Sequence, residues 1–352
     1  MSNPATLDTF TCPAPLGAGP RILLGHGSGG TLSAKLVRDV FLPAFDNAAL
    51  ARLDDQAVLR VGESRLAFTT DSFVVKPLFF PGGDIGSLAV HGTINDLAMG
   101  GAKPLFLSAA FIIEEGFELD ALARVVASMR AAAAAAGVEI VTGDTKVVEK
   151  GSGDGLFINT SGIGLVPPGL ELSADRARPG DRILLSGSIG DHGIAILAKR
   201  EGLEFETAIE SDSAPLHTLV NAMLAAGGAI RCMRDPTRGG LSSTCNEIAE
   251  SSKVSMLLEE TAIPIGEEVR GACELLGLDP LYVANEGKLV AFVAPEAADG
   301  ILAAMRAHPL GREAAIIGTV TDGPPGSVMM RTDFGTTRLV EMLAGDQLPR
   351  IC

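Results

Sequence analysis

Residues 166–180 read VPPGLELSADRARPG and separate the chain into two halves of similar size. The Pro-Pro-Gly beginning and the Pro-Gly end of this stretch interrupt any regular pattern, because proline and glycine end helices and strands. A chain of 352 residues is long enough for two domains that each bury their own core. We therefore predict a domain boundary here, with an N-terminal domain over 21–167 and a C-terminal domain over 175–344.

Both halves interleave short β-prone runs with helical stretches, which is typical of an α/β or α+β fold. In the first half the pattern predicts strands at 57–61, 65–70, 105–113, 139–142 and 157–166 and a helix over 119–136. In the second half it predicts strands at 182–186 and 289–294 and helices over 193–201, 215–226 and 240–251. Residues 1–20 are expected to form a loose arm, and residues 345–352 an exposed, mobile tail.

Composition excludes several classes of protein. The formal net charge of -15 repels polyanions and no basic patch offsets it, so no nucleic-acid partner is expected. No apolar run approaches the roughly 20 residues that span a bilayer, and no targeting segment is recognisable. Five cysteines without a CxxC pair argue against a disulfide framework. These features predict a soluble protein of the reducing cytoplasm, without a membrane partner.

Acidic residues beside small or turn-forming ones recur at or near the ends of predicted elements in the first half. They are Asp54-Asp55, Thr70-Asp71-Ser72, Asn95-Asp96 and Gly143-Asp144-Thr145. Magnesium takes oxygen ligands, usually a few carboxylates together with substrate phosphates. Acids gathered from several element ends therefore predict a magnesium and nucleotide site, whereas any one of them alone could be a solvated turn residue.

Two glycine-rich segments, 25–30 and 237–240, each precede a predicted helix. Free N–H groups at a helix start can bind phosphate oxygens. Neither segment matches the P-loop or the dinucleotide-binding pattern, so the signal depends on its neighbours. Asp235 lies just before the second segment, which makes Arg238, Gly239 and Gly240 the better candidates for binding a nucleotide.

The last residue of the sequence is Cys352. A thiol beside its own carboxylate has its pKa raised by the like charge, which Arg350 partly offsets. We interpret Cys352 as a carrier thiol, and the other four cysteines as small core residues.

The five histidines show no HxH or HxxxH spacing, so no zinc site is expected. Structural roles are the preferred interpretation. His26 and His91 flank glycine-rich turns and could line the site.

Seven segments, taken together and in order, resemble the HypE family of hydrogenase maturation factors. They are GHGSGG from Gly25, TDSFVVKPLFFPGGDIG from Thr70, HGTINDLAMGGAKP from His91, GDTKVV from Gly143, RDPTRGGL from Arg234, ANEGK from Ala284 and PRIC from Pro349. Several are similar, more loosely, to aminoimidazole ribonucleotide synthetase, selenophosphate synthetase and thiamine-monophosphate kinase. The resemblance implies a two-domain fold, a homodimer in which the N-terminal domains pair into a β-barrel, and ATP in a groove between the domains.

The resemblance also implies roles for single residues. The metal and phosphate ligands would be Asp55, Asp71, Asp96 and Asp235. Asp54 would lie close to them and contribute to binding the nucleotide. Asp144 and Thr145 would hold the nucleotide, and Lys146 and Glu286 would lie near the reacting tail.

The implied reaction is the ATP- and Mg²⁺-dependent dehydration of a carbamoyl group on Cys352 to a cyano group. Glu286 is the preferred base, and Lys146 polarises the thiocarbamate or shares the proton transfer. HypF would load the carbamoyl group, and the HypC–HypD complex would receive the cyanide. Two alternatives stay open: a synthetase or kinase of the superfamily that acts on a free small molecule, and a non-catalytic thiol carrier.

Overall fold

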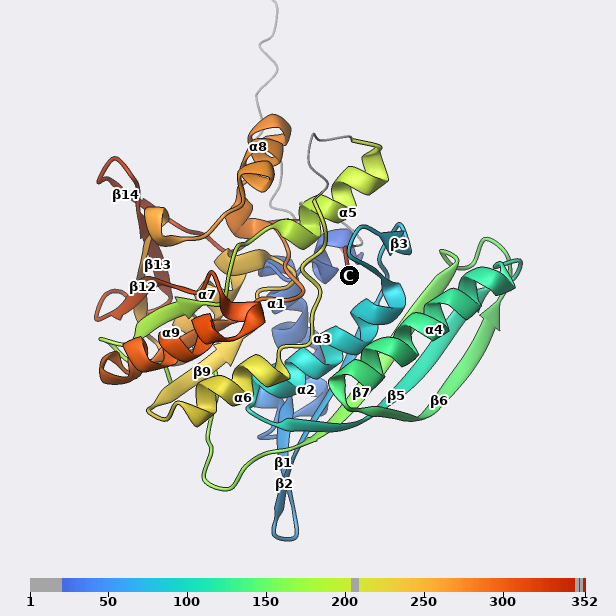
Figure 1. Ribbon diagram of the computed structural model, residues 1–352, viewed down its shortest axis with the longest axis horizontal. Coiled ribbons are helices and arrows are strands. Elements are labelled where there is room, and N and C mark those ends of the chain that lie inside the picture. Colours follow the sequence, from blue (N-terminus) through green and yellow to red (C-terminus); the bar gives the residue numbers. More distant parts are fainter. Residues whose placement is uncertain (1–20, 204–208, 346–347, 349–350) are drawn as a thin grey trace, which may run out of the picture.

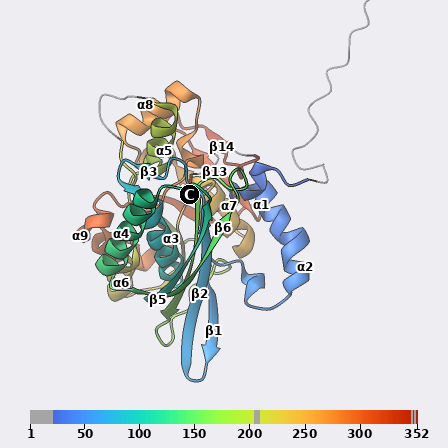
Figure 2. The ribbon, with the colours of Figure 1, turned by 90° about the vertical axis from the view of Figure 1, so that its right-hand side faces the viewer.

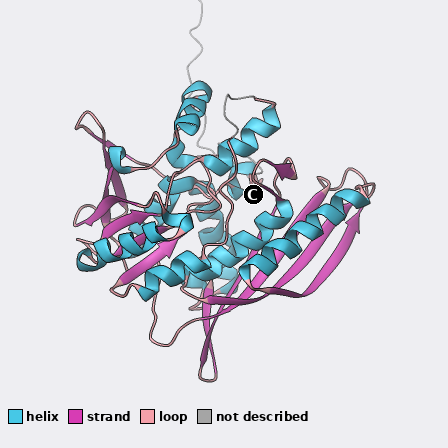
Figure 3. Ribbon diagram, in the orientation of Figure 1, coloured by secondary structure: helices cyan, strands magenta, loops and turns pink. Residues whose placement is uncertain are grey.

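The computed structural model describes residues 21–203, 209–345, 348 and 351–352, so the expected arm over 1–20 lies outside the described residues. Two large sheets, each with its own helices, form most of the molecule, and a short two-stranded sheet accompanies them (Figure 1, Figure 3). No helix in the described ranges has both the length and the apolar character that a bilayer crossing requires.

The N-terminal half is built on an open five-stranded sheet of order β1-β2-β7-β5-β6, in which only β5 and β6 are parallel neighbours. Its strands match the predicted runs, with β2, β5 and β6 longer than expected. The elements are η1 Leu24–Gly27, α1 Thr31–Leu36, η2 Val37–Phe41, α2 Leu42–Phe45, η3 Leu50–Arg52, β1 Ala57–Val61, β2 Ser64–Phe73, β3 Phe79–Phe80, β4 Gly83–Asp84, α3 Ile85–Met99, β5 Lys103–Glu114, α4 Leu119–Ala136, β6 Glu139–Val148 and β7 Leu156–Leu165.

Helices α3 and α4 cover one face of this sheet, and α1 and α2 stand off the opposite side (Figure 2). The predicted helix α4 has the observed bounds, because Gly137 adopts the left-handed conformation that ends it. Helix α3 begins at Asp84, whose side chain accepts the N–H groups of Gly86 and Ser87 at 2.7 and 3.2 Å. The sheet does not close on itself in the single chain, and β6 is a largely exposed edge strand.

The C-terminal half carries a seven-stranded sheet of order β14-β13-β10-β12-β8-β11-β9. The predicted strands and helices of this half are present, shifted by at most two residues at each end. The elements are β8 Arg182–Leu185, α5 Asp191–Glu201, α6 His217–Ala225, β9 Ile230–Arg234, α7 Gly240–Ser252, β10 Ser255–Glu259, η4 Glu260–Ala262, α8 Glu267–Leu276, η5 Pro280–Tyr282, β11 Val290–Val293, η6 Pro295–Ala297, α9 Ala298–Ala307, η7 Pro309–Gly311, β12 Ala315–Thr321, β13 Ser327–Arg331 and β14 Thr337–Leu339.

The two halves share buried side chains along α3. Ala98 and Met99 pack into a cluster of second-half residues around Leu216, and Phe73 belongs to a cluster that also contains Ala284. Apolar burial of this kind fixes one half against the other. The interface between the two halves, called the seam below, is therefore well packed. The last residues of the chain lie at this seam.

Candidate active site

The end of the tail is buried at this seam, which corrects the expectation of an exposed tail. Ile351 and Cys352 are 4% and 9% exposed and belong to the same apolar cluster as Phe73 and Ala284. The N–H of Val74 donates to the main-chain oxygen of Cys352 at 3.1 Å. The local composition suggested a loose segment, but apolar contacts from both domains hold its last two residues in place.

Three ionisable side chains, Glu286, Asp71 and Arg238, act on the thiol of Cys352. Burial raises its pKa first of all, Glu286 and Asp71 raise it further, and Arg238 opposes them. A hydrogen bond with Glu286 contributes in the same direction. The docked sulfur is therefore a thiol, in direct contact with the residue that the sequence analysis chose as the base.

Glu286 is 2% exposed, and its Oε1 has no hydrogen-bond partner among the described residues. Burial raises its pKa well above the usual range for a carboxyl, and Asp235 and Asp71 add to that effect. A carboxyl group whose charged form is disfavoured by burial binds a proton more tightly than a solvated one, so its carboxylate is a stronger base. Glu286 can thus both donate a proton to a group at the sulfur and take one from it.

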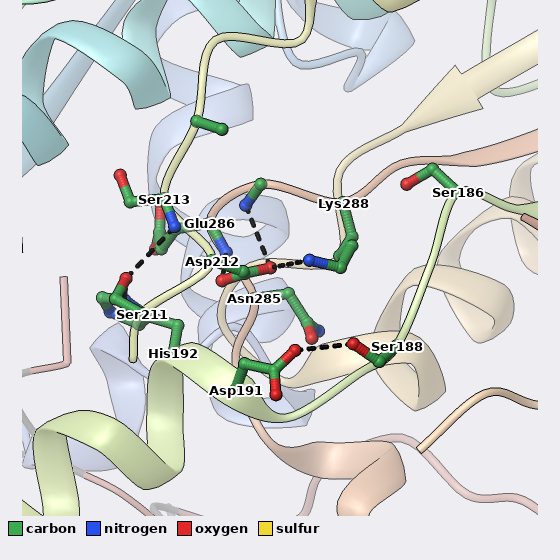
Figure 4. Close-up of polar contacts among 12 residues, drawn as sticks. Ser186, Ser188, Asp191, His192, Ser211, Asp212, Ser213, Asn285, Glu286 and Lys288 are labelled. Carbon is green, nitrogen blue, oxygen red and sulfur yellow. Dashed lines mark hydrogen bonds and ion pairs between the residues drawn. The ribbon is translucent and has the colours of Figure 1, made fainter. Parts of the chain in front are cut away.

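One loop, residues 209–216, positions Glu286 (Figure 4). The carboxylate of Asp212 accepts the N–H groups of Glu286 and Gly287 and pairs with Lys288 at 3.0 Å. Asn95 of α3 donates from Nδ2 to the main-chain oxygen of Glu286 at 3.1 Å. Gly287 must be glycine, because a Cβ there would collide with the main-chain oxygen of Asp212.

Asp55, Asp71, Asp96 and Asp235 form a second feature, an acidic cluster. Desolvation raises the pKa of all four, to about 6 for Asp55 and about 8 for Asp235. Their mutual repulsion is a further cause, so the structure brings these four predicted residues near one another. Asn95-Asp96 was expected at an element end but lies inside α3, which turns Asp96 toward β2, where Thr69 Oγ1 lies 2.8 Å from its Oδ2.

The acidic cluster suits a cation that brings its own ligands. Buried carboxylates require a counter-charge, and Arg234 supplies part of it through its 3.1 Å pair with Asp55. Within the described ranges, no three His, Cys, Asp or Glu side chains converge as a preformed metal cage. Magnesium commonly keeps waters and binds through one or two carboxylates together with substrate phosphates, and this donor set is compatible with that mode.

Asp54 contacts the connection between the two domains. Its carboxylate accepts the N–H of Ala174 at 2.8 Å, contacts the Ser173 hydroxyl at 3.2 Å and pairs with Arg52 at 3.0 Å. These contacts fasten the connection between the domains and occupy the oxygens of Asp54. The role beside the nucleotide that the sequence suggested for Asp54 stays a prediction.

Gly239 and Gly240 are required by the backbone conformation at this turn. Both have positive φ values, +80° and +61°, and a Cβ on Gly240 would collide with the main-chain oxygen of Leu281. The N–H of Gly240 already donates to Thr237 at 3.0 Å, so it is not a free phosphate donor. Arg238 projects into the site, where Cys352 is the first cause that raises its pKa and its NH2 lies 3.9 Å from Asp71.

The first glycine-rich segment, 25–30, holds the base of the tail. Thr31 donates its N–H to Leu343 at 2.9 Å, and the hydroxyl of Ser28 donates to the main-chain oxygen of Gly345 at 2.6 Å. A Cβ on Gly30 would collide with Leu343. The close approach of the tail is therefore a reason for glycine at this position, in addition to the phosphate binding that the sequence suggested.

Asp144, Thr145 and Lys146 lie on the edge strand β6 and are exposed in the single chain. Lys146 pairs with Asp144 at 2.8 Å, and their side chains are 69% and 63% exposed. Strands β5 and β7 separate β6 from β2, which carries Asp71. The structure does not bring Lys146 to the buried thiol within one chain.

The sequence analysis missed His192, Ser211 and Asp212. His192 was assigned a structural role, and the 209–216 loop received no assignment. The polar run Ser211-Asp212-Ser213 just before Pro215 was the available signal, since such residues commonly bond to backbone groups at a helix start.

Both halves of the chain match known domain families. The first, over residues 53–166, matches the N-terminal domain of AIR synthase related proteins, and the second, over 178–331, matches their C-terminal domain. The fold and site therefore define a two-domain protein of the AIR synthase class.

Within that class, carbamoyl dehydratase HypE of Azotobacter vinelandii is 63% identical over 327 residues, which cover 93% of this chain and 96% of that protein. The crystal structure of hydrogenase maturation protein HypE in complex with ATP shares 52% identity and a TM-score of 0.80 over 94% of this chain and 100% of that one. The HypE–HypF complex gives 50% identity and a TM-score of 0.83 over 88% and 99%. The chain belongs to the HypE family.

Proposed function

We propose that this chain is an ATP-dependent carbamoyl dehydratase whose substrate is an S-carbamoyl group on its own Cys352. The observation that carries the proposal is the burial of Cys352 against Glu286 and Arg238, beside the acidic cluster. The HypE relatives are named carbamoyl dehydratases, and one HypE structure is a complex with ATP. The product, a thiocyanate, would supply the cyanide ligands of nickel–iron hydrogenase.

The reaction balances as thiocarbamate plus ATP giving thiocyanate, ADP, hydrogen phosphate and one released proton. The carbonyl oxygen leaves as part of phosphate, because oxide alone is a very poor leaving group, and the nitrogen loses both of its protons. Glu286 takes a proton from that nitrogen, because its raised pKa makes its carboxylate a stronger base than a solvated one. Arg238 stabilises the negative charge that develops beside the sulfur.

Asp55, Asp71, Asp96 and Asp235 would hold Mg²⁺, which neutralises charge on the transferring phosphoryl group. Burial raises the pKa of all four carboxyls, neighbouring acids raise those of Asp55, Asp96 and Asp235 further, and a bound cation relieves that repulsion. This set therefore gains more from a cation than solvated acids would.

A homodimer completes the proposal. The face of the N-terminal sheet away from α3 and α4 carries large apolar side chains that stay about two-fifths exposed in one chain, namely Leu59, Phe68, Phe106, Ile112, Ile163 and Leu165. An apolar surface of this extent is typical of a subunit interface. Asp144, Thr145 and Lys146 lie beside it on β6, so we assign their roles toward the nucleotide and the tail to the dimer.

HypF is the proposed source of the carbamoyl group, since a HypE–HypF complex is known for the family, and HypC–HypD is the proposed acceptor of the cyanide. A synthetase or kinase for a free small molecule fits less well, because the chain's own Cys352 occupies the position beside Glu286. A non-catalytic carrier would not need four buried carboxylates whose ionisation is costly.

The test is the intact mass of the carbamoylated full-length protein before and after Mg-ATP. We expect the loss of one water's mass, confined to the C-terminal peptide, with release of ADP and phosphate. Cys352→Ala and Asp71→Asn should show no loss, whereas Cys273→Ala, which removes another buried cysteine, should behave like the wild type. Turnover of ATP on a diffusing compound by a chain lacking residues 345–352 would overturn the proposal.

A further inference from the structure

His192, the second residue of α5, has no role in the proposed reaction, yet it contacts the tail directly. Its side chain is fully buried, and its Nε2 lies 2.9 Å from the main-chain oxygen of Ile351. On the other side of the ring, Nδ1 lies 2.7 Å from Oγ of Ser211 (Figure 4).

The direction of these hydrogen bonds follows from the groups involved. The oxygen of Ile351 can only accept, so Nε2 of His192 must carry the proton, and Nδ1 of the neutral ring must then accept. The hydroxyl of Ser211 supplies that proton, and its oxygen accepts the N–H of Ser213 at 3.1 Å. Ser213, Ser211, His192 and Ile351 thus form one chain of donors that ends on the tail.

The two last residues of the tail are held by different domains. The N–H of Val74, just after β2, binds the oxygen of Cys352 at 3.1 Å, and His192 binds the oxygen of Ile351 from α5. Phe80 of the N-terminal half meets the His192 ring edge-on, with ring centroids 5.6 Å apart. Docking the tail therefore uses one main-chain contact from each side of the seam.

We propose that His192 is a positioning residue that latches the tail in its docked state and so places the Cys352 thiol beside Glu286. Loss of the latch shifts the tail toward an undocked state in which the thiol is accessible. This inference rests on the proposed function only for its purpose, because docking itself can be measured without ATP or a carbamoyl group.

The experiment measures iodoacetamide alkylation of each cysteine in the full chain, by mass spectrometry of its peptides. In the wild type, Cys352 should react slowly. In His192→Leu, which removes the donor, its rate should rise about tenfold, the effect of losing one buried hydrogen bond. His192→Gln places an amide N–H near the position of Nε2 and should stay within about twofold of the wild type. Ser211→Ala should raise the rate about threefold, because the ring loses the partner that fixes its tautomer.

Cys232, Cys245 and Cys273 are buried and serve as internal controls in every variant. The latch requires that only Cys352 becomes more reactive. An unchanged rate in His192→Leu, an equal rise in the Gln variant, or a rise in all four cysteines together would overturn it, the last by showing that His192 only supports the core. If the alkylation pattern is as expected but no water is lost with Mg-ATP, the proposed function fails and the latch stands.

Discussion

The carboxylate of Asp212 accepts the backbone N–H of Glu286 at 3.0 Å, although the two residues come from different connections of the C-terminal half. The same carboxylate binds Lys288, and the two side chains are 3% and 13% exposed. A base is only as well placed as the backbone that carries it. The proposed role of Glu286 as a base therefore depends on the 209–216 loop as well as on the ANEGK segment.

Replacing Asp212 with alanine should slow dehydration about a hundredfold, because the main chain at Glu286 loses its support. The free energy of unfolding should also fall by about 3–5 kcal/mol, because the buried Lys288 loses its counter-charge. The variant should therefore unfold at a lower urea concentration. Single-turnover dehydration and urea titration measure the two effects. Asp191→Asn, whose carboxylate bonds to Ser188 and not to this loop, is the matched control and should keep nearly the full rate.

Glu286→Gln should lower the rate of dehydration by about 10²–10⁴-fold, the usual contribution of a general base. The fold should tolerate the change, because Gln keeps the shape and removes a carboxyl whose burial already disfavours its charge. The readouts are thiocyanate formation by mass and the midpoint of thermal unfolding. A rate close to that of the wild type would assign the base to another residue.

Mg-ATP should raise the unfolding temperature of the wild type, because a ligand that binds only the native state stabilises it. In Asp96→Asn and Asp235→Asn this shift should be largely lost. Glu247→Gln, which removes a nearby acid that pairs with Arg234 outside the acidic cluster, should retain it. An undiminished shift in both cluster variants would refute the metal assignment.

His91 should make the fold sensitive to acid. Burial, with a contribution from His217, lowers its pKa to about 4, against 6.5 in an unfolded chain. The unfolded state therefore binds the proton first, and stability is lost as the pH falls from 6.5 through 4. At about pH 4.5 this costs the wild type roughly 2–3 kcal/mol relative to neutral pH. His91→Gln should remove that part of the loss in urea titrations, whereas His26→Gln should leave it in place.

A charge on the uncovered sheet face should prevent pairing of subunits. Phe68→Glu, on β2, is expected to give a monomer in analytical ultracentrifugation, because a carboxylate would be buried without a partner. Phe334→Glu changes an even more exposed phenylalanine, at the turn between β13 and β14, and should leave the oligomeric state as it is. Equal sedimentation of both variants would argue against this face as the interface.

Local patterns predicted the fold well where a signal is local. The amphipathic run and Gly137 set the bounds of α4, and β-prone runs located the five strands of the N-terminal sheet but only β8 and β11 of the seven in the C-terminal sheet. Helix α3 was not assigned, because it is buried on nearly all sides and so lacks a polar face that would reveal its period.

The site was predictable as a set of residue types but not as an arrangement. Asp54 and Asp55 are neighbours in sequence, yet one fastens the domain connection and the other joins the acidic cluster. The direction of a side chain and its long-range packing decide such differences, and a local sequence pattern predicts neither of them. The same holds for the tail. Its glycine and proline predict a flexible backbone, whereas Ile351 and Cys352 are held by contacts with residues that are distant in the sequence.

The burial of Cys352 also bears on when its sulfur can react with other molecules. The thiolate, not the thiol, is the nucleophile that attacks peroxide and other electrophiles, and burial raises the pKa of this thiol, which favours its protonated form. The docked chain is thus a dormant form, shielded from oxidation and from mixed disulfides. If Cys352 is the carrier thiol that we propose, its loading requires the tail to leave this docked position, so the undocking of Ile351 and Cys352 would set when loading can occur.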